Sequence, residues 1–254
     1  MSKQETDTAR PAAANGVAAV DRALSILAAF TPGEPSLTLA ELAARTGIYK
    51  STILRLAQSL IRGRLLIRLD DGQFQIGSEA MRLNALYQER DGLNDLLLPR
   101  MRQLAKTTGE SVVFYERDND IRFCRLRVES DQPIRHHVRE GEVMPLKYGS
   151  AGRVLLAFSG EKGEPYETIR NTYFYVSLGE RVPDTAAVAT PILGPRQKLV
   201  GSLCVSGPSS RLDAAMAART IPSLLQAAQA VTRDIGGDPR GFDGPIAKTS
   251  AEIA

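Results

Sequence analysis

The stretch "LAELAARTGIYKSTILRLAQSL", residues 39–60, contains two short runs of apolar residues at helical spacing, separated by a Thr-Gly pair. Thr38 followed by Glu41 is a capping-box pattern that begins the first helix. Gly47 suits the left-handed conformation that ends it. The second helix begins near Tyr49, and its apolar face consists of Ile53, Leu56, Ala57 and Leu60. Two helices joined by a tight turn are therefore predicted, as in a helix-turn-helix.

This part of the chain is also locally cationic. The net charge is only +3, from 32 Lys and Arg against 29 Asp and Glu, which is too small to indicate nucleic-acid binding by itself. Residues 45–68, however, contain six basic residues and no acid, namely Arg45, Lys50, Arg55, Arg62, Arg64 and Arg68. A basic run is often only a solvated helix face. Combined with the helix-turn-helix pattern, it predicts contact with phosphates.

The neighbouring segments extend the helix pair to a winged helix-turn-helix. Residues 17 to about 30 have helical spacing, and "LLIRLDDGQFQIG", residues 65–77, has two apolar segments around Asp71-Gly72, a two-residue hairpin signal. In such a domain the second helix of the pair enters the major groove with its N-terminal side chains, and the hairpin lies along the DNA backbone. The predicted DNA-contacting residues are Tyr49, Lys50, Ser51, Thr52, Arg55 and, on the hairpin, Arg68.

The rest of the chain predicts a linker helix at residues 78–92 and an α+β domain at residues 93–236. Strands are predicted for "SVVFYER", "IRFCRLRV", "PIRHHVRE", "YFYVSL", "AAVATPIL" and "KLVGSLCVSG". Helices are predicted for "GSAGRVLLAF" and residues 212–235. An antiparallel sheet with helices packed on it follows from this order. The remaining residues, 1–16 and 237–254, are predicted to be flexible tails.

Composition excludes several classes of protein. No stretch approaches the roughly 18 apolar residues of a membrane span, and the N-terminus has no apolar segment of a secretory signal. Cys124 and Cys204 lie far apart without metal-ligand spacing, so neither a disulfide framework nor a metal site is predicted. We therefore expect a cytoplasmic protein with no cofactor and no membrane partner.

The two halves together resemble a known family. The order "RALSIL", "LTLAELAARTG", "KSTILRLAQSL", "DGQFQIG", "TGESV", "RVES", "SAGRVLLAF" and "VSGPSSRL" resembles the IclR-type bacterial transcriptional regulators from residue 17 to about residue 236. The resemblance implies a winged helix-turn-helix DNA-binding domain, a dimerising linker helix and a GAF-like C-terminal effector domain. It also implies a homodimer or dimer of dimers that binds palindromic operator DNA and a small metabolite, commonly an organic or aromatic acid.

The C-terminal domain contains candidate effector-binding residues. Free N–H groups where "YGSAGR" opens a helix would cradle a carboxylate, with Ser150 and Ala151 best placed, although small residues there also permit close helix packing. The resemblance implies effector contact for Ser150, Ala151, Cys204 and Ser206. Strand alternation would place His136 on the face of Ile134 and Val138, where it points into the cavity or is a structural histidine.

Three further positions concern the specificity of the pocket. Met144 is a further candidate effector-binding residue. Ser177 and Ala187 stand where some acid-binding members have Asp and Cys, so the lining is expected to be more neutral and the effector an anionic or aromatic acid. The segment after Phe158 is shorter than is usual in the family, which predicts a more open or differently lidded pocket.

These observations favour a ligand-responsive transcription factor that controls genes of small-molecule metabolism. An enzyme with a DNA-binding head is poorly supported, because "GSAG" is not a nucleophile elbow and the only two histidines are adjacent. A DNA-binding regulator whose C-terminal domain serves only dimerisation or protein contacts is the alternative. Bulky substitutions at Ser150 and Ser206 would separate these alternatives, because only a sensor would lose its response.

Overall fold

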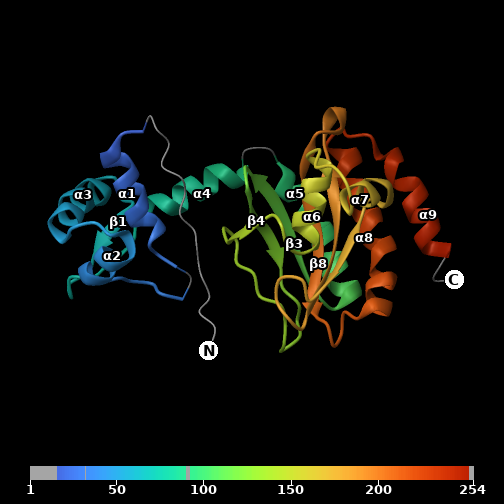
Figure 1. Ribbon diagram of the computed structural model, residues 1–254, viewed down its shortest axis with the longest axis horizontal. Coiled ribbons are helices and arrows are strands. Elements are labelled where there is room, and N and C mark those ends of the chain that lie inside the picture. The colour runs from blue at the N-terminus through green and yellow to red at the C-terminus, as the bar shows by residue number, and fades with distance from the viewer. Residues whose placement is uncertain (1–15, 32, 90–91, 252–254) are drawn as a thin grey trace. The chain divides into compact units, whose positions relative to one another are not determined.

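The computed structural model describes residues 16–31, 33–89 and 92–251. The chain forms two compact units, Met1–Arg90 and Asp91–Ala254, each with its own hydrophobic core (Figure 1). Most of the N-terminal segment expected to be a flexible tail, residues 1–15, lies outside the described residues.

The first unit has the predicted order of three helices followed by a hairpin and a further helix. Its elements are α1 (Ala18–Ala28), α2 (Leu39–Thr46), α3 (Lys50–Arg62), β1 (Leu66–Arg68), β2 (Phe74–Ile76) and α4 (Glu79–Glu89). The capping box is present: Thr38 accepts from the Glu41 N–H, and the Glu41 side chain accepts from the Thr38 N–H. Gly47 ends α2 at a φ of 69°. The helix-turn-helix predicted from the sequence is confirmed.

The hairpin differs in detail from the sequence prediction. β1 and β2 pair antiparallel with Arg68 opposite Phe74, and the Leu69 N–H donates to the Gln73 carbonyl at 2.8 Å. Three residues therefore form the turn, rather than the two of Asp71-Gly72. The Gly72 N–H donates to the Leu69 carbonyl, and Gly72 has a φ of 85°, which is a type I turn followed by a left-handed residue.

The second unit is a six-stranded antiparallel sheet with helices on both faces. Its strand order is β5-β4-β3-β8-β7-β6. The strands are β3 (Ser111–Asp118), β4 (Ile121–Val128), β5 (Val143–Pro145), β6 (Tyr175–Leu178), β7 (Thr185–Leu193) and β8 (Leu199–Pro208). The helices are α5 (Leu93–Thr108), α6 (Ser150–Phe158), α7 (Tyr166–Thr172), α8 (Ala214–Asp234) and α9 (Asp243–Ala251). The predicted α+β class with an antiparallel sheet is confirmed.

Alternation along the strands divides the interior of this unit into two cores. Val112 and Phe114 of β3 pack with apolar residues of α5 and α8. Val113 and Tyr115 of the same strand point to the other face and pack with residues of α6. Ala151, at the beginning of α6, and Cys204 of β8 belong to this second core.

The predicted strand "PIRHHVRE" is wrong, because residues 131–140 form a loop. The edge of β4 is instead paired by β5, with Arg122 opposite Met144. The Gly141 N–H also donates to the Cys124 carbonyl at 2.7 Å. β5 pairs only with residues 121–123 of this edge, and residues 131–140 leave the sheet without pairing with the rest of β4. Ile134 is exposed whereas Val138 is buried, so these two residues do not share one face.

The C-terminal segment also differs from the sequence prediction. Residues 239–242 form a 3-10 helix and α9 follows, where a flexible tail was expected. Phe242 is fully buried and stacks edge-on against Tyr173, with ring centroids 4.7 Å apart. One aromatic side chain thus anchors a segment whose Gly and Pro content indicated a tail. The last three residues, 252–254, lie outside the described residues.

Candidate functional site

The N-terminal end of α3 presents the predicted DNA-contacting side chains to solvent. Tyr49 is the N-cap residue and is 85% exposed. Lys50, Ser51 and Arg55 are exposed as well, and Thr52 is half-buried. The opposite face of α3 is anchored in the core by Ile53, Ala57 and Leu60. The 3.6-residue period of the helix separates these two faces, which leaves the polar face available to a partner.

The basic residues of this unit are not equivalent. Arg45 forms a two-pronged ion pair with Glu34, at 2.7 and 2.9 Å, and donates to the Ala29 carbonyl, so it secures the loop after α1. Lys50, Arg55 and Arg68 form no ion pair with any residue that the structure describes. The Arg68 guanidinium lies 5.9 Å from the centroid of the buried Phe74 ring. These three cations thus remain for contact with an external anion.

The second unit contains a cavity at the beginning of α6, with about 40 Å³ of open space. Strands β3, β4, β6, β7 and β8, the N-terminal turn of α6 and the loop 131–140 contribute to its wall. The predicted effector residues found in this wall are His136, Ser150, Ala151, Ser177, Cys204 and Ser206. Met144 is not among the lining residues, because its side chain is buried in the apolar cluster beneath α6.

Small polar side chains are hydrogen-bonded to one another in the floor of the cavity. The Ser150 N–H donates to Ser177 Oγ at 3.2 Å, and Ser150 Oγ lies 3.6 Å from Cys204 Sγ. Burial raises the pKa of Cys204 to about 11, so this thiol stays protonated at neutral pH. Burial also raises the pKa of Tyr115, which keeps its phenol neutral. The floor is therefore uncharged.

His136 comes from the loop and reaches into the cavity. Its Nε2 lies 2.9 Å from Nη2 of Arg181, and its Nδ1 lies 3.2 Å from Oγ of Ser206. Because arginine can only donate, Nε2 must accept and Nδ1 must carry the proton. Burial, followed by the positive charge of Arg181, lowers the pKa of His136 from 6.5 to about 4. His136 is thus neutral and caps Arg181 without cancelling its charge.

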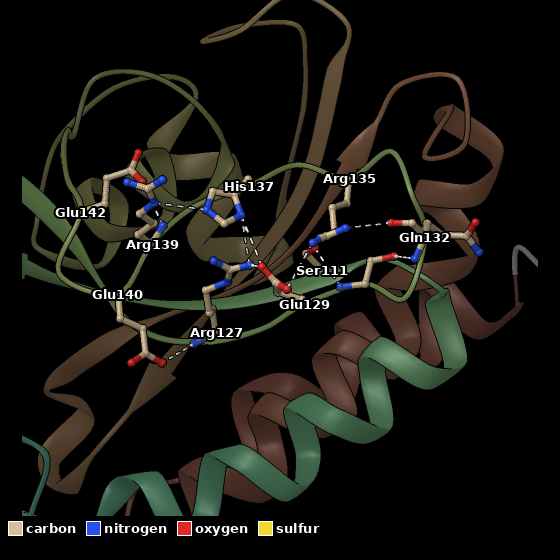
Figure 2. A network of polar contacts seen from close by, with 10 residues as sticks. Ser111, Arg127, Glu129, Gln132, Arg135, His137, Arg139, Glu140 and Glu142 are labelled. Atoms are coloured by element: carbon tan, nitrogen blue, oxygen red, sulfur yellow. Dashed lines mark hydrogen bonds and ion pairs between the residues drawn. The ribbon is translucent and has the colours of Figure 1, made fainter. Parts of the chain in front are cut away.

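Ion pairs fix the loop that carries His136, as Figure 2 shows. Glu129 forms ion pairs with Arg127 and, at 3.5 Å, with Arg135, and its Oε1 lies 3.3 Å from Nδ1 of His137. On the other side of the loop, the Arg211 guanidinium donates to the Ile134 carbonyl at 2.7 Å. These contacts hold the loop without strand pairing.

Four charged or phenolic side chains of the wall were missed by sequence reasoning: Tyr115, Arg122, Glu180 and Arg181. Ser177 and Ala187 line the cavity as neutral residues, but the expectation of a more neutral lining did not include the two guanidinium groups that face it. Arg122 had a sequence signal, because alternation in "IRFCRLRV" puts it on the inward face of Cys124. Arg181 lies in a turn after β6 and had no such signal.

Among residues 16–31, 33–89 and 92–251, no helix combines the length and apolar character needed to cross a bilayer. No group of three or more His, Cys, Asp or Glu side chains is arranged to hold a metal ion in that part of the chain.

Both units of the chain match known protein families. The family model "IclR helix-turn-helix domain" matches residues 19–70, and "Bacterial transcriptional regulator IclR C-terminal" matches residues 86–166. The HTH-type transcriptional regulator TtgV of Pseudomonas putida is 30% identical over 204 residues, covering 79% of this chain and 73% of TtgV. KipR of Bacillus subtilis is 24% identical, with 80% and 91% covered.

Solved structures show the same fold. A regulator of this type from Alicyclobacillus acidocaldarius superimposes with a TM-score of 0.74 at 22% identity, covering 87% of this chain and all of the other. An IclR homolog from Microbacterium hydrocarbonoxydans, solved in complex with 4-hydroxybenzoate, has a TM-score of 0.72 at 18% identity, with 85% and 98% covered. The chain therefore belongs to the IclR family of bacterial transcriptional regulators.

Proposed function

We propose that this protein is an effector-responsive transcription factor that controls genes of small-molecule metabolism. The observation that carries the proposal is a cavity lined by Arg122, Arg181 and the beginning of α6, in a chain of a DNA-binding regulator family. Guanidinium groups and helix N-terminal N–H groups favour carboxylates. The effector is accordingly an organic acid, and the protein has no catalytic role.

The first unit would bind operator DNA through α3 and the hairpin. Lys50, Ser51 and Arg55 project from the exposed face of α3, and Tyr49 and Thr52 flank them. In a winged helix-turn-helix these positions reach base edges and phosphates in the major groove. Arg68 on the hairpin would contact a phosphate and position the domain without reading sequence. Such a protein acts in the cytoplasm, where its operator DNA lies.

A homodimer, or a dimer of dimers, is the proposed active form. Apolar side chains are exposed on α1 and α4 of the first unit, including Val20, Met81 and Leu86, of which Met81 is 78% exposed. Exposed apolar surface of this kind marks a protein contact. A twofold-symmetric dimer would match a palindromic operator.

The acid-binding assignment is supported by the family fold. The Microbacterium homolog was solved with 4-hydroxybenzoate, an aromatic acid. An acid in the cavity would change operator affinity only if it binds the DNA-competent and DNA-incompetent arrangements of the dimer unequally. The alternative, a second unit that serves only dimerisation or protein contacts, has no use for uncompensated guanidinium groups in a cavity.

A substitution in the cavity wall tests this proposal. Ser206→Leu places a larger side chain beside His136 and should abolish the response of operator binding to acids, while operator affinity without acid stays unchanged. The matched control is Ser210→Leu, at an exposed serine just beyond β8. Operator binding is followed by fluorescence anisotropy during titration with a panel of small organic and aromatic acids. If Ser206→Leu responds as the wild type does, the cavity is not the sensor.

A further inference from the structure

Arg122 is a buried cation without an anionic partner. Its side chain belongs to a residue that is 3% exposed, and its Nη1 donates to the carbonyl oxygens of Pro145 and Tyr148 at 2.7 and 2.8 Å. Its Nε is buried and has no hydrogen-bond partner. No carboxylate of the described residues forms an ion pair with it. Two carbonyl dipoles and the face of the Tyr115 ring, whose centroid lies 5.4 Å from Cζ of Arg122, therefore stabilise this charge in place of a carboxylate.

The other buried arginine of the same strand shows how unusual this is. Arg125 is 1% exposed, and its Nη1 donates to Oε1 of Glu116 at 2.6 Å. A buried cation ordinarily has such a counter-charge, because removing it from water costs several kcal/mol. Arg122 has the same burial but faces the cavity instead of a carboxylate. An external anion would be its missing partner.

Arg181 is a second cation in the same wall. It forms no ion pair within the described ranges, and its contact is the neutral imidazole of His136. Burial lowers the pKa of Arg122, and the charge of Arg181 acts in the same direction, so the two guanidinium groups affect one another. A single carboxylate, with one negative charge, could not neutralise both charges.

The single carboxylate of the wall is already engaged elsewhere. Oε2 of Glu180 accepts from the Gly149 N–H at 3.3 Å and lies 3.6 Å from Nε of Arg153. Its Oε1 accepts from the Tyr175 hydroxyl at 2.7 Å. Glu180 thus compensates Arg153 and leaves the charges of Arg122 and Arg181 uncancelled.

The backbone at α6 brings a further positive potential to Arg122. A Cβ on Gly152 would lie 2.1 Å from the Leu146 carbonyl oxygen and 2.3 Å from Nη1 of Arg122. Only glycine permits this approach, so the first turn of α6 packs directly on the guanidinium group. The partial positive charge of the helix N-terminus adds to that of Arg122.

Resting on the proposed function, we infer that the effector is a compact dianion. One anionic group would pair with Arg122 at the beginning of α6, and the second would pair with Arg181 in place of His136. An ionised group binds a guanidinium more strongly than a neutral imidazole does. The open space of about 40 Å³ holds only a few water molecules, so the acid must displace His136 to enter.

Matched acids test the inference on the full-length protein. Binding of malonate, succinate and glutarate is measured by isothermal titration calorimetry in Hepes buffer, beside propionate, butyrate and valerate of equal carbon number. At least one dicarboxylate should bind at least about tenfold more tightly than its monocarboxylate, as expected for an added charge-assisted contact. Inorganic phosphate is titrated in the same way, because a phosphate carries both negative charges on one group.

Variants of the two arginines test whether each guanidinium group binds the dianion. Arg181→Gln and Arg122→Gln should each weaken binding of the preferred dianion at least about tenfold and bring it close to that of the monocarboxylate. Arg117→Gln, an exposed arginine of β3, is the control and should leave binding unchanged. Arg181 is only partly buried, so its variant keeps the test valid if Arg122→Gln does not fold.

The outcomes separate this inference from the proposed function. Preference for phosphate, with weak binding of all dicarboxylates, would assign a phosphorylated effector and still support a dianion. Equal or tighter binding of monocarboxylates, or no binding of any dianion, would overturn the inference. A monocarboxylate that changes operator affinity would at the same time leave the sensor function intact.

Discussion

At the scale of single residues, burial fixes the protonation states that define the pocket. His136 is neutral and accepts from Arg181, while the thiol of Cys204 and the phenol of Tyr115 keep their protons because burial raises their pKa values. The two arginines are thus the only fully charged groups in the wall that lack a counter-charge within the described residues. An incoming anion meets fixed positive charge and neutral hydrogen-bonding groups.

The low pKa of His136 predicts a pH-dependent stability. Its folded pKa of about 4 lies below the usual 6.5, so the unfolded chain binds more protons between these values. The contribution of His136 is complete above about pH 6.5 and is lost as the pH falls toward 4, by up to ~1.4 kcal/mol per pH unit. Urea unfolding at pH 7.5 and 5.0 should therefore show a larger loss for the wild type than for His136→Gln.

The neighbouring histidine provides the control for this experiment. His137 is exposed, and His137→Gln should change the pH dependence much less than His136→Gln does. If wild type and His136→Gln lose the same free energy of unfolding between the two pH values, His136 is not held neutral in the folded state.

Sequence reasoning found the neutral residues of the pocket and missed its charges. A local sequence pattern or the family resemblance identified the elements that carry the pocket residues Ser150, Ala151, Ser177, Cys204 and Ser206. Arg122 and Arg181 are 59 positions apart in the sequence, and only the pairing of β4, β3, β8, β7 and β6 brings them to one cavity. Strand alternation could place Arg122 on the inward face, but no local pattern shows that Arg181 lies beside it, because long-range sheet topology brings the two together.

At the scale of elements, the first unit was predictable because its signals are local. The Thr38 cap, the Gly47 turn and the apolar stripe of α3 each depend on a few consecutive residues. Residues 131–140 were mispredicted for the opposite reason. Their alternating pattern suits a strand, but contacts with side chains distant in the sequence hold them in a loop, such as that of Arg211 with the Ile134 carbonyl.

The hairpin and α3 should contribute differently to DNA binding. Arg55→Ala should weaken binding to the operator by about 1–3 kcal/mol and leave nonspecific affinity nearly unchanged, if Arg55 reads a base. Arg68→Ala should weaken all sequences alike and make the salt dependence of binding shallower by about one ion. Both effects are measurable by anisotropy titrations at several salt concentrations.

The outcomes of these titrations show which kind of DNA contact each arginine makes. Equal losses on operator and nonspecific DNA would make Arg55 a phosphate contact. An unchanged salt slope for Arg68→Ala would remove the hairpin from the interface. Arg45→Ala is not an equivalent variant, because its ion pair with Glu34 secures the loop after α1.

The C-terminal helices should stabilise the second unit. Phe242 is fully buried against Tyr173, so Phe242→Ala should lower the free energy of unfolding by about 3–5 kcal/mol. Arg240→Ala, in the same 3-10 helix, removes only an exposed ion pair with Asp238, which solvent screens, and should lower the free energy of unfolding far less than Phe242→Ala does. Urea unfolding followed by circular dichroism measures both. Equal stability of Phe242→Ala and wild type would mean that this segment does not pack as described.

At the scale of the whole molecule, the proposed function assigns a separate activity to each of the two units. The first presents unpaired cations on α3 and the hairpin, and the second encloses a cavity with uncompensated guanidinium groups. A transcription factor of this family is useful as a sensor only if these activities are coupled. By linkage, an acid that weakens operator binding must itself bind less tightly when the operator is bound.

Operator affinity in the presence and absence of the preferred acid tests this coupling most directly. Labelled operator DNA is titrated with the full-length protein by anisotropy, without acid and with acid at 100 times its dissociation constant. We predict a change in operator affinity of at least about fivefold for the wild type, within the usual range of allosteric coupling, and a response that needs at least about tenfold more acid for Arg181→Gln. Saturating acid that leaves the operator affinity of the wild type unchanged would contradict the account.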